Sequence, residues 1–64
     1  MAQEPLNFTA VDHALLRRRV VDTRSLREGV LVAVLAEDGR RVAYVRGDDH
    51  LEFTAPADCL RAAR

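Results

Sequence analysis

The strongest pattern in the chain is a pair of apolar runs, residues 30–36 and 41–46, that flank a short polar turn. Asp38-Gly39 lies at the centre of this turn, and Asp-Gly supplies the positive φ angles that a type I′ turn needs. The pattern therefore predicts a β-hairpin. Because a two-residue turn also fixes the register, we expect the pairs Leu35–Val42, Val34–Ala43, Ala33–Tyr44 and Val32–Val45.

Both faces of this hairpin are apolar. With that register one face would carry Leu31, Ala33, Leu35, Val42 and Tyr44, and the other Val30, Val32, Val34, Ala43 and Val45. A hairpin with one solvated side would instead alternate apolar and polar residues. Something must therefore cover each face. Either the remaining chain does so, or a second copy covers one face as a symmetric dimer.

The segments around the hairpin predict the other elements. Apolar residues at helical spacing, Phe8, Val11 and Leu15, predict an N-terminal helix over residues 8–19. A β-branched strand at residues 20–23 precedes the hairpin, and a third meander strand at residues 50–54 follows it.

The end of the chain predicts a short helical turn, because Pro56 is well tolerated at a first helical position. This turn either runs on to Ala63 or ends as a 3₁₀ turn before a last short strand. The predicted fold is mostly β or α+β. A polar tail at residues 1–7 precedes one small domain at residues 8–64, with the helix at 8–19 and a bent antiparallel β-meander or barrel at 20–64.

This order of elements resembles a small β-barrel of the Src-homology-3 type, the shape shared by Tudor and KOW modules. Residues 20–63 are also similar to a set of small uncharacterised actinobacterial proteins. The matching positions are Val21-Asp22-Thr23-Arg24, Gly29-Val30, Gly39, Val42 with Val45-Arg46, Glu52-Phe53 and Pro56-Ala57-Asp58-Cys59-Leu60-Arg61-Ala62-Ala63. These are turn and core residues, so the resemblance implies a fold and no activity.

Length and composition narrow the class of protein. A chain of 64 residues has a marginal core, and its one cysteine, Cys59, excludes an intrachain disulfide. No apolar run reaches the ~20 residues of a membrane span, and the first residues do not form a secretory signal. Ten Arg without any Lys is typical of a GC-rich bacterial genome. We therefore expect a bacterial cytoplasmic protein.

Charge is divided along a chain whose net charge is zero. Residues 1–27 hold five Arg and three acids, which is +2, and residues 28–64 hold five Arg and seven acids, which is −2. Such a chain suits self-association or an electrostatically matched partner. The acidic stretch Asp48-Asp49-His50-Leu51-Glu52 has metal-ligating residue types, but a solvated hairpin turn explains it as well.

The sequence thus predicts a non-enzymatic protein-interaction module, homo-oligomeric and accessory or regulatory, with no cofactor and no metal. The expected interface residues are Phe8, Leu15, Leu31, Leu35, Val42 and Tyr44. The alternative is a small nucleic-acid-binding barrel that contacts phosphates through Arg17, Arg18, Arg19, Arg40 and Arg41. The chain has few aromatic residues on which the bases of a single-stranded nucleic acid could stack.

Overall fold

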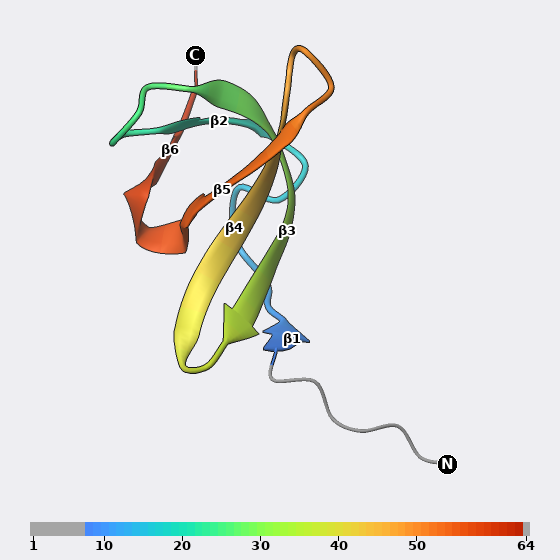
Figure 1. Ribbon diagram of the computed structural model, residues 1–64, viewed down its shortest axis with the longest axis vertical. Helices are drawn as coiled ribbons and strands as arrows, with labels where there is room; N and C mark the ends of the chain where they lie inside the picture. The colour runs from blue at the N-terminus through green and yellow to red at the C-terminus, as the bar shows by residue number, and fades with distance from the viewer. Residues whose placement is uncertain (1–7, 64) are drawn as a thin grey trace.

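A computed structural model describes residues 8–63 as an antiparallel sheet of six strands (Figure 1). The strands are β1 (Phe8–Ala10), β2 (Arg19–Asp22), β3 (Glu28–Glu37), β4 (Arg40–Gly47), β5 (Glu52–Pro56) and β6 (Leu60–Ala62). Their order in the sheet is β5-β4-β3-β2-β6, and β1 pairs with β3 off this path. The tail predicted for residues 1–7 lies outside the described residues.

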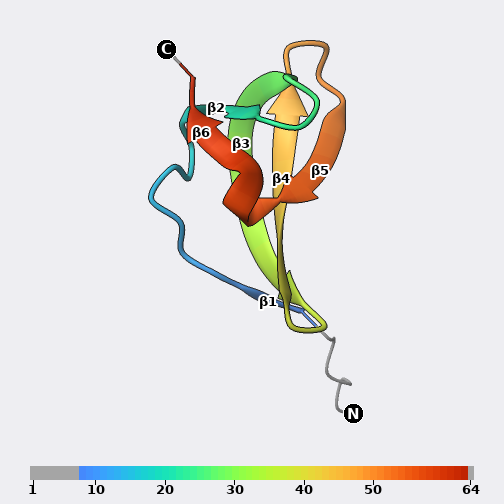
Figure 2. The same ribbon diagram turned by 90° about the vertical axis from the view of Figure 1, so that its left-hand side faces the viewer.

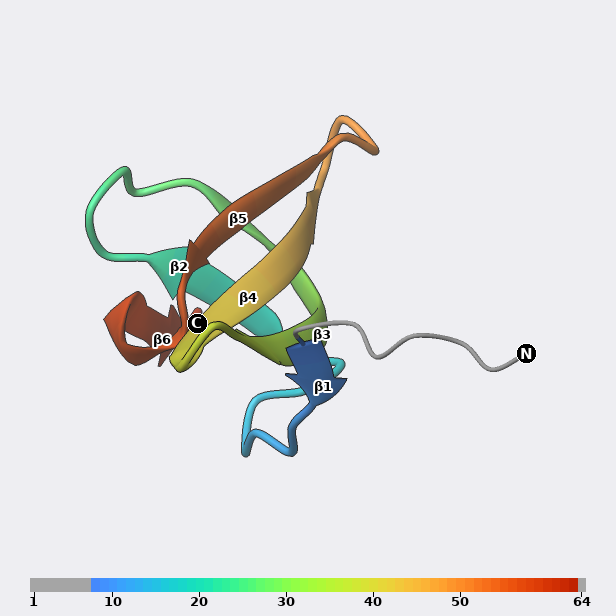
Figure 3. The same cartoon turned by 60° about the horizontal axis from the view of Figure 1, so that its bottom comes forward.

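The sheet curls, so that β2 and β6 lie opposite β4 and β5 (Figure 3). A 3₁₀ turn, η1 (Ala57–Cys59), connects the two ends of the strand order, because it follows β5 and precedes β6. β6 then pairs antiparallel with β2. Of the two endings that the sequence left open, the structure has the 3₁₀ turn followed by a short strand. This small β-rich domain is compatible with a barrel-like fold.

The prediction of an N-terminal helix over residues 8–19 is wrong, and with it the α+β class. β1 pairs with the end of β3, and the chain then runs along β3 toward β2 (Figure 2). The Val11 N–H donates to the Val34 carbonyl at 2.9 Å, and the Arg17 N–H donates to the Leu31 carbonyl at 2.8 Å. Within residues 8–63 the sole helical element is η1.

The physical reason is competition between local and long-range partners. An isolated helix of about twelve residues is marginal in water, whereas β3 offers this segment both hydrogen bonds and an apolar surface. Val11, Leu15 and Leu16 still pack against the core, as an amphipathic helix would have done. Val11 reaches the core beside β3, and Leu15 and Leu16 reach it from two overlapping tight turns. Arg17 (φ 70°) adopts a left-handed conformation within the second turn, just before β2.

The predicted type I′ hairpin is confirmed. Asp38 (φ 51°) and Gly39 (φ 83°) both have positive φ, and Glu37 pairs with Arg40 across the turn. The pairs Leu35–Val42, Val34–Ala43 and Ala33–Tyr44 are as expected.

The fourth expected pair is wrong, because a β-bulge interrupts the register at Val32. Leu31, not Val32, pairs with Val45. A bulge inserts one extra residue and so reverses which side chains face inward beyond it. Leu31 is fully buried as a result, while Val32 is 36% exposed. The bulge places the larger side chain in the core, which consists of Val20, Leu31, Val34, Ala43, Val45 and Ala57.

One buried carboxylate, Asp22, organises the loop between β2 and β3. It is 2% exposed and accepts hydrogen bonds from the Arg24 N–H at 3.0 Å and the Ser25 hydroxyl at 2.9 Å. Arg24 Nε lies 3.5 Å from the same carboxylate. Burial alone would raise the pKa of Asp22, but the hydrogen bonds from Arg24 and Ser25 outweigh it and hold the pKa below its ordinary value.

Acidification should therefore destabilise the fold through Asp22. A carboxyl whose pKa is lowered by folding contributes its full stability above its ordinary pKa of 3.8 and loses it as the pH falls toward the folded value. We expect Asp22→Asn to cost about 1–3 kcal/mol at neutral pH and to weaken the dependence of stability on pH. Urea denaturation at neutral and acidic pH measures both effects. If the free energy of unfolding falls by the same amount between neutral and acidic pH in the Asp22→Asn variant and in the unaltered protein, the acid sensitivity comes from other groups.

Candidate ligand-binding site

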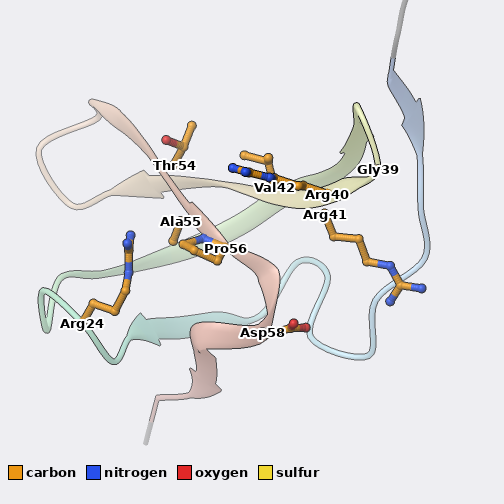
Figure 4. Close-up of a pocket in the computed structure, with 9 residues that line it drawn as sticks. All are labelled: Arg24, Gly39, Arg40, Arg41, Val42, Thr54, Ala55, Pro56 and Asp58. Carbon is orange, nitrogen blue, oxygen red and sulfur yellow. The ribbon is translucent and has the colours of Figure 1, made fainter.

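A cavity of about 710 Å³ opens beside the start of β4, where β5 stops (Figure 4). β5 pairs with β4 only as far as Val42–Pro56, whereas β3 pairs with β4 as far as Arg40. The end of the hairpin thus extends past β5, and the chain turns away through η1. The cavity is lined by Arg24, Gly39, Arg40, Arg41, Val42, Thr54, Ala55, Pro56 and Asp58.

The lining combines positive charge with an apolar floor. Arg24, Arg40 and Arg41 contribute three guanidinium groups, of which that of Arg24 is paired with Asp22, and Asp58 contributes the one carboxylate of the lining. The floor is formed by Val42, Ala55 and Pro56. In a chain whose net charge is zero, this is a local excess of positive charge. An exposed guanidinium can bind a carboxylate or phosphate in a bidentate manner, so the cavity suits an anionic ligand with apolar parts.

The three arginines are held differently. The β2–β3 loop positions Arg24, because Asp22 accepts hydrogen bonds from its backbone and pairs with its side chain. Arg40 and Arg41 are exposed and leave β4 on opposite sides (Figure 4). Among the described residues, neither forms an ion pair. Their charge is therefore available to a ligand.

The structure separates the arginines that the sequence grouped as nucleic-acid contacts. Arg40 and Arg41 line the large cavity with Arg24. Arg19 lies elsewhere, and its guanidinium forms ion pairs with Glu28 at 3.3 Å and Asp48 at 3.1 Å. The hydrogen bond from Arg19 lowers the pKa of Asp48. Arg17 and Arg18 are exposed beside the bulge, where Arg17 lines a smaller cavity of about 220 Å³.

The predicted interface residues do not lie on one surface. Leu31 is fully buried, and Leu15 packs against the core. Leu35, Val42 and Tyr44 share the outer face of the hairpin, where all three are half-buried. Phe8 begins β1, but its side chain lies outside what the structure describes.

The hydroxyl group of Tyr44 already has a hydrogen-bond partner within the hairpin. Its hydroxyl donates a hydrogen bond to Glu37 Oε2 across the hairpin. This bond raises the pKa of Tyr44 above its ordinary value, because the charged carboxylate favours the protonated phenol. The outer face of the hairpin is therefore apolar around Leu35 and Val42 and polar at its edge.

The acidic turn after β4 has structural partners. Asp48 pairs with Arg19, and Asp49 Oδ1 accepts a hydrogen bond from the Leu51 N–H at 3.0 Å. In the part of the chain that the structure describes, no group of three His, Cys, Asp or Glu residues is placed to hold a metal ion. The same part contains no helix that could cross a membrane.

Sequence reasoning named Arg40 and Arg41 but missed Arg24 and Asp58 as their neighbours. Two signals pointed to the site. Pro56 favours the end of a strand, since proline cannot donate a ladder hydrogen bond, and adjacent arginines follow the hairpin turn. The position of Arg24 depends on the loop around Asp22, which has no comparable signal.

Comparisons with protein-family models, with curated proteins and with solved structures found no match to this chain. The geometry and charge of the cavity are therefore the observations from which a function can be inferred.

Proposed function

We propose that this protein is a non-enzymatic interaction module that binds an acidic segment of a partner protein in the cavity between β4 and η1. The presence of Arg24, Arg40 and Arg41 in the lining of one cavity, together with the apolar residues Val42, Ala55 and Pro56, carries this proposal. Carboxylates of the partner would form charge-assisted hydrogen bonds with the guanidinium groups. An apolar side chain of the same segment would contact Val42 and Pro56.

The proposal extends to fold type and setting. We propose that residues 20–63 form a barrel of the Src-homology-3 type. The run of β2 to β5, the 3₁₀ turn before β6 and the pairing of β6 with β2 support this. An accessory or regulatory protein of a bacterial cytoplasm is the setting that the sequence predicts.

The contacts of the aromatic side chains favour a protein partner over a nucleic acid. The Arg27 guanidinium lies 4.2 Å from the centre of the Phe53 ring, and the Tyr44 hydroxyl is bonded to Glu37. Neither ring lines the cavity, so the site lacks the stacking surfaces that bind unpaired bases.

Binding of a labelled acidic peptide tests the proposed function. We expect the peptide Ser-Val-Glu-Glu-Val-Ser to bind at least about tenfold more tightly than its analogue with two lysines in place of the glutamates. Replacing Arg40 and Arg41 together by alanine should weaken the binding about tenfold, because two charge-assisted contacts are lost. Fluorescence anisotropy at low salt measures these affinities, since salt screens exposed charges.

Arg46→Ala is the matched control for this experiment. Arg46 is an exposed arginine of the same strand that does not line the cavity, so its loss should leave the affinity unchanged. Equal binding of the lysine analogue would contradict the proposal. Tighter binding of an oligothymidylate than of the acidic peptide would support the nucleic-acid alternative.

Self-association remains a prediction of its own. The half-buried outer face around Leu35, Val42 and Tyr44 is the surface that would carry it, because a two-fold axis presents the same patch on both subunits. We expect Leu35→Glu to shift an oligomer toward monomer in size-exclusion chromatography with light scattering. A strict monomer of the unaltered chain at high micromolar concentration would contradict the prediction.

A further inference from the structure

The edge of β4 beside the cavity is unpaired for two residues. β3 pairs with β4 through Ala36–Arg41 and Glu37–Arg40, but β5 reaches only Val42. Among residues 8–63 no strand pairs with Arg40 or Arg41 on the side away from β3. Such an edge presents backbone N–H and carbonyl groups in the geometry that accepts another strand.

The path of the chain at Pro56 creates this edge. Pro56 still has extended backbone angles (φ −60°, ψ 134°), but the chain then enters η1, where Ala57 is buried against the core. The chain thus leaves the line of β5, and the cavity opens between η1 and the start of β4. Asp58 and Arg24 contribute to the lining away from β4 (Figure 4). The cavity therefore lies where a continued β5 would run.

The side chains along the edge indicate which residues an added strand would carry. Arg40 and Arg41 point to opposite sides of β4 (Figure 4), as consecutive residues of a strand do. An added strand alternates in the same way, so two consecutive residues would face one arginine each. Opposite charges at directly opposed positions stabilise strand pairing. Two consecutive acidic residues therefore fit this edge best.

A second copy of this chain fits the edge poorly. Pairing two β4 edges about a two-fold axis would place the arginines of both copies against each other, and like charges directly opposite destabilise a sheet. The consecutive acids Asp48-Asp49 lie in the turn after β4, where Arg19 and the Leu51 N–H bind them. Glu37-Asp38 already forms the hairpin end. The charge of the edge therefore favours a different protein.

We propose that the partner's acidic segment binds as an added β-strand along β4, in the place that β5 leaves after Pro56. Two consecutive acidic residues of that segment pair with Arg40 and Arg41. This inference rests on the proposed function and deepens it, because it assigns the partner an extended conformation and a local acidic motif. Backbone hydrogen bonds to the edge supply affinity, and the acidic pair supplies specificity.

Backbone methylation of the probe separates strand addition from simple charge attraction. We would compare Ser-Val-Glu-Glu-Val-Ser with two versions that carry N-methyl groups on alternate amides, each version blocking one edge of the peptide strand. A strand that pairs through one edge should lose binding at least about tenfold in one version and keep it in the other. Equal effects in the two versions, whether retention or loss, would overturn strand addition.

The outcomes distinguish this inference from the proposed function. Equal, tight binding of all three peptides would leave an acidic-segment site that does not use strand pairing. Failure of the unmethylated peptide to bind would overturn both. An isomer with its glutamates separated by one residue should bind a few-fold more weakly, because both acids then face the same side of β4. Equal affinity of the isomer would count against the consecutive acidic motif.

Amide hydrogen exchange gives a second readout on the protein itself. Arg40 closes the hairpin against Glu37, so in an antiparallel ladder the backbone N–H of Arg41 faces away from β3. On binding of the unmethylated peptide, exchange at the Arg41 N–H should slow, since a new hydrogen bond protects it. The Arg46 amide lies at the other end of β4, where β5 already pairs, and should be unaffected. Saturating peptide without any added protection at Arg41 would overturn strand addition.

Discussion

Replacing Leu31 by alanine should unfold most of the protein at room temperature. Leu31 is fully buried in the core beside Val34 and Val45, and truncating such a leucine costs about 2–5 kcal/mol. A single core in a chain of this length rarely supplies more than about 3–5 kcal/mol of net stability. The loss is therefore comparable with the whole free energy of unfolding. Urea denaturation followed by circular dichroism measures it, because the chain has no tryptophan.

Two valines of the same strand provide the matched comparison. The bulge leaves Val32 36% exposed, whereas Val34 is 1% exposed. We expect Val34→Ala to cost about 2 kcal/mol and Val32→Ala less than about 1 kcal/mol. With an uninterrupted register the two valines would share one face and cost the same. Equal losses at Val32 and Val34, with a small loss at Leu31, would contradict the bulge.

Gly29→Ala is expected to have an effect of similar size, for a steric reason. A Cβ atom at Gly29 would lie 2.2 Å from the Arg46 carbonyl oxygen and 2.9 Å from a methyl carbon of Val45. The oxygen belongs to the backbone of the paired strand β4, so it cannot move without opening the sheet. Overpacking of this kind costs about 3 kcal/mol. Circular dichroism should show a largely unfolded chain.

Gly47→Ala is the control, because Gly47 is the residue paired with Gly29. The nearest atom to a Cβ there is Asp49 Oδ1 at 3.0 Å, the end of an exposed side chain whose displacement would weaken one hydrogen bond, that from the Leu51 N–H. We therefore expect a cost below about 1 kcal/mol. A Gly29→Ala protein with the stability of the unaltered chain would show that β3 and β4 are further apart at this end than the structure has them.

The hairpin was predictable because its information is local. Asp38-Gly39 fixes the turn type through two backbone conformations, and a two-residue turn fixes the pairs next to it. The bulge at Val32 had no such signal. It depends on whether Leu31 or Val32 fits the space between β2 and β4, and a sequence of consecutive apolar residues does not distinguish them.

For the N-terminal segment, the sequence predicted the buried residues correctly but the secondary structure wrongly. Its apolar spacing at Val11 and Leu15 is helical, and the structure does bury these residues. Spacing correctly identified which side chains reach the core but not the conformation that brings them there. That conformation was decided by β3, whose free edge accepts β1 and the backbone of Arg17.

The candidate site was likewise only partly predictable from the sequence. Arg40 and Arg41 were identifiable as a pair of adjacent charges beside a turn. Their meeting with Arg24 and Asp58 required the sheet to curl and the chain to turn away at Pro56. The residues that form the cavity are separated by up to 34 positions in the sequence, from Arg24 to Asp58, so no local pattern could group them.

By itself the sequence determined the hairpin, its turn and its first pairs, because those depend on the backbone preferences of neighbouring residues. Only the tertiary structure decided the bulge that buries Leu31, the strand that replaces a helix at Phe8–Ala10, and the charged cavity beside β4. Each of these depends on competition between distant segments for the same edge or the same core space. That competition is settled by packing and by backbone hydrogen bonds across the sheet, and not by the local pattern of residues.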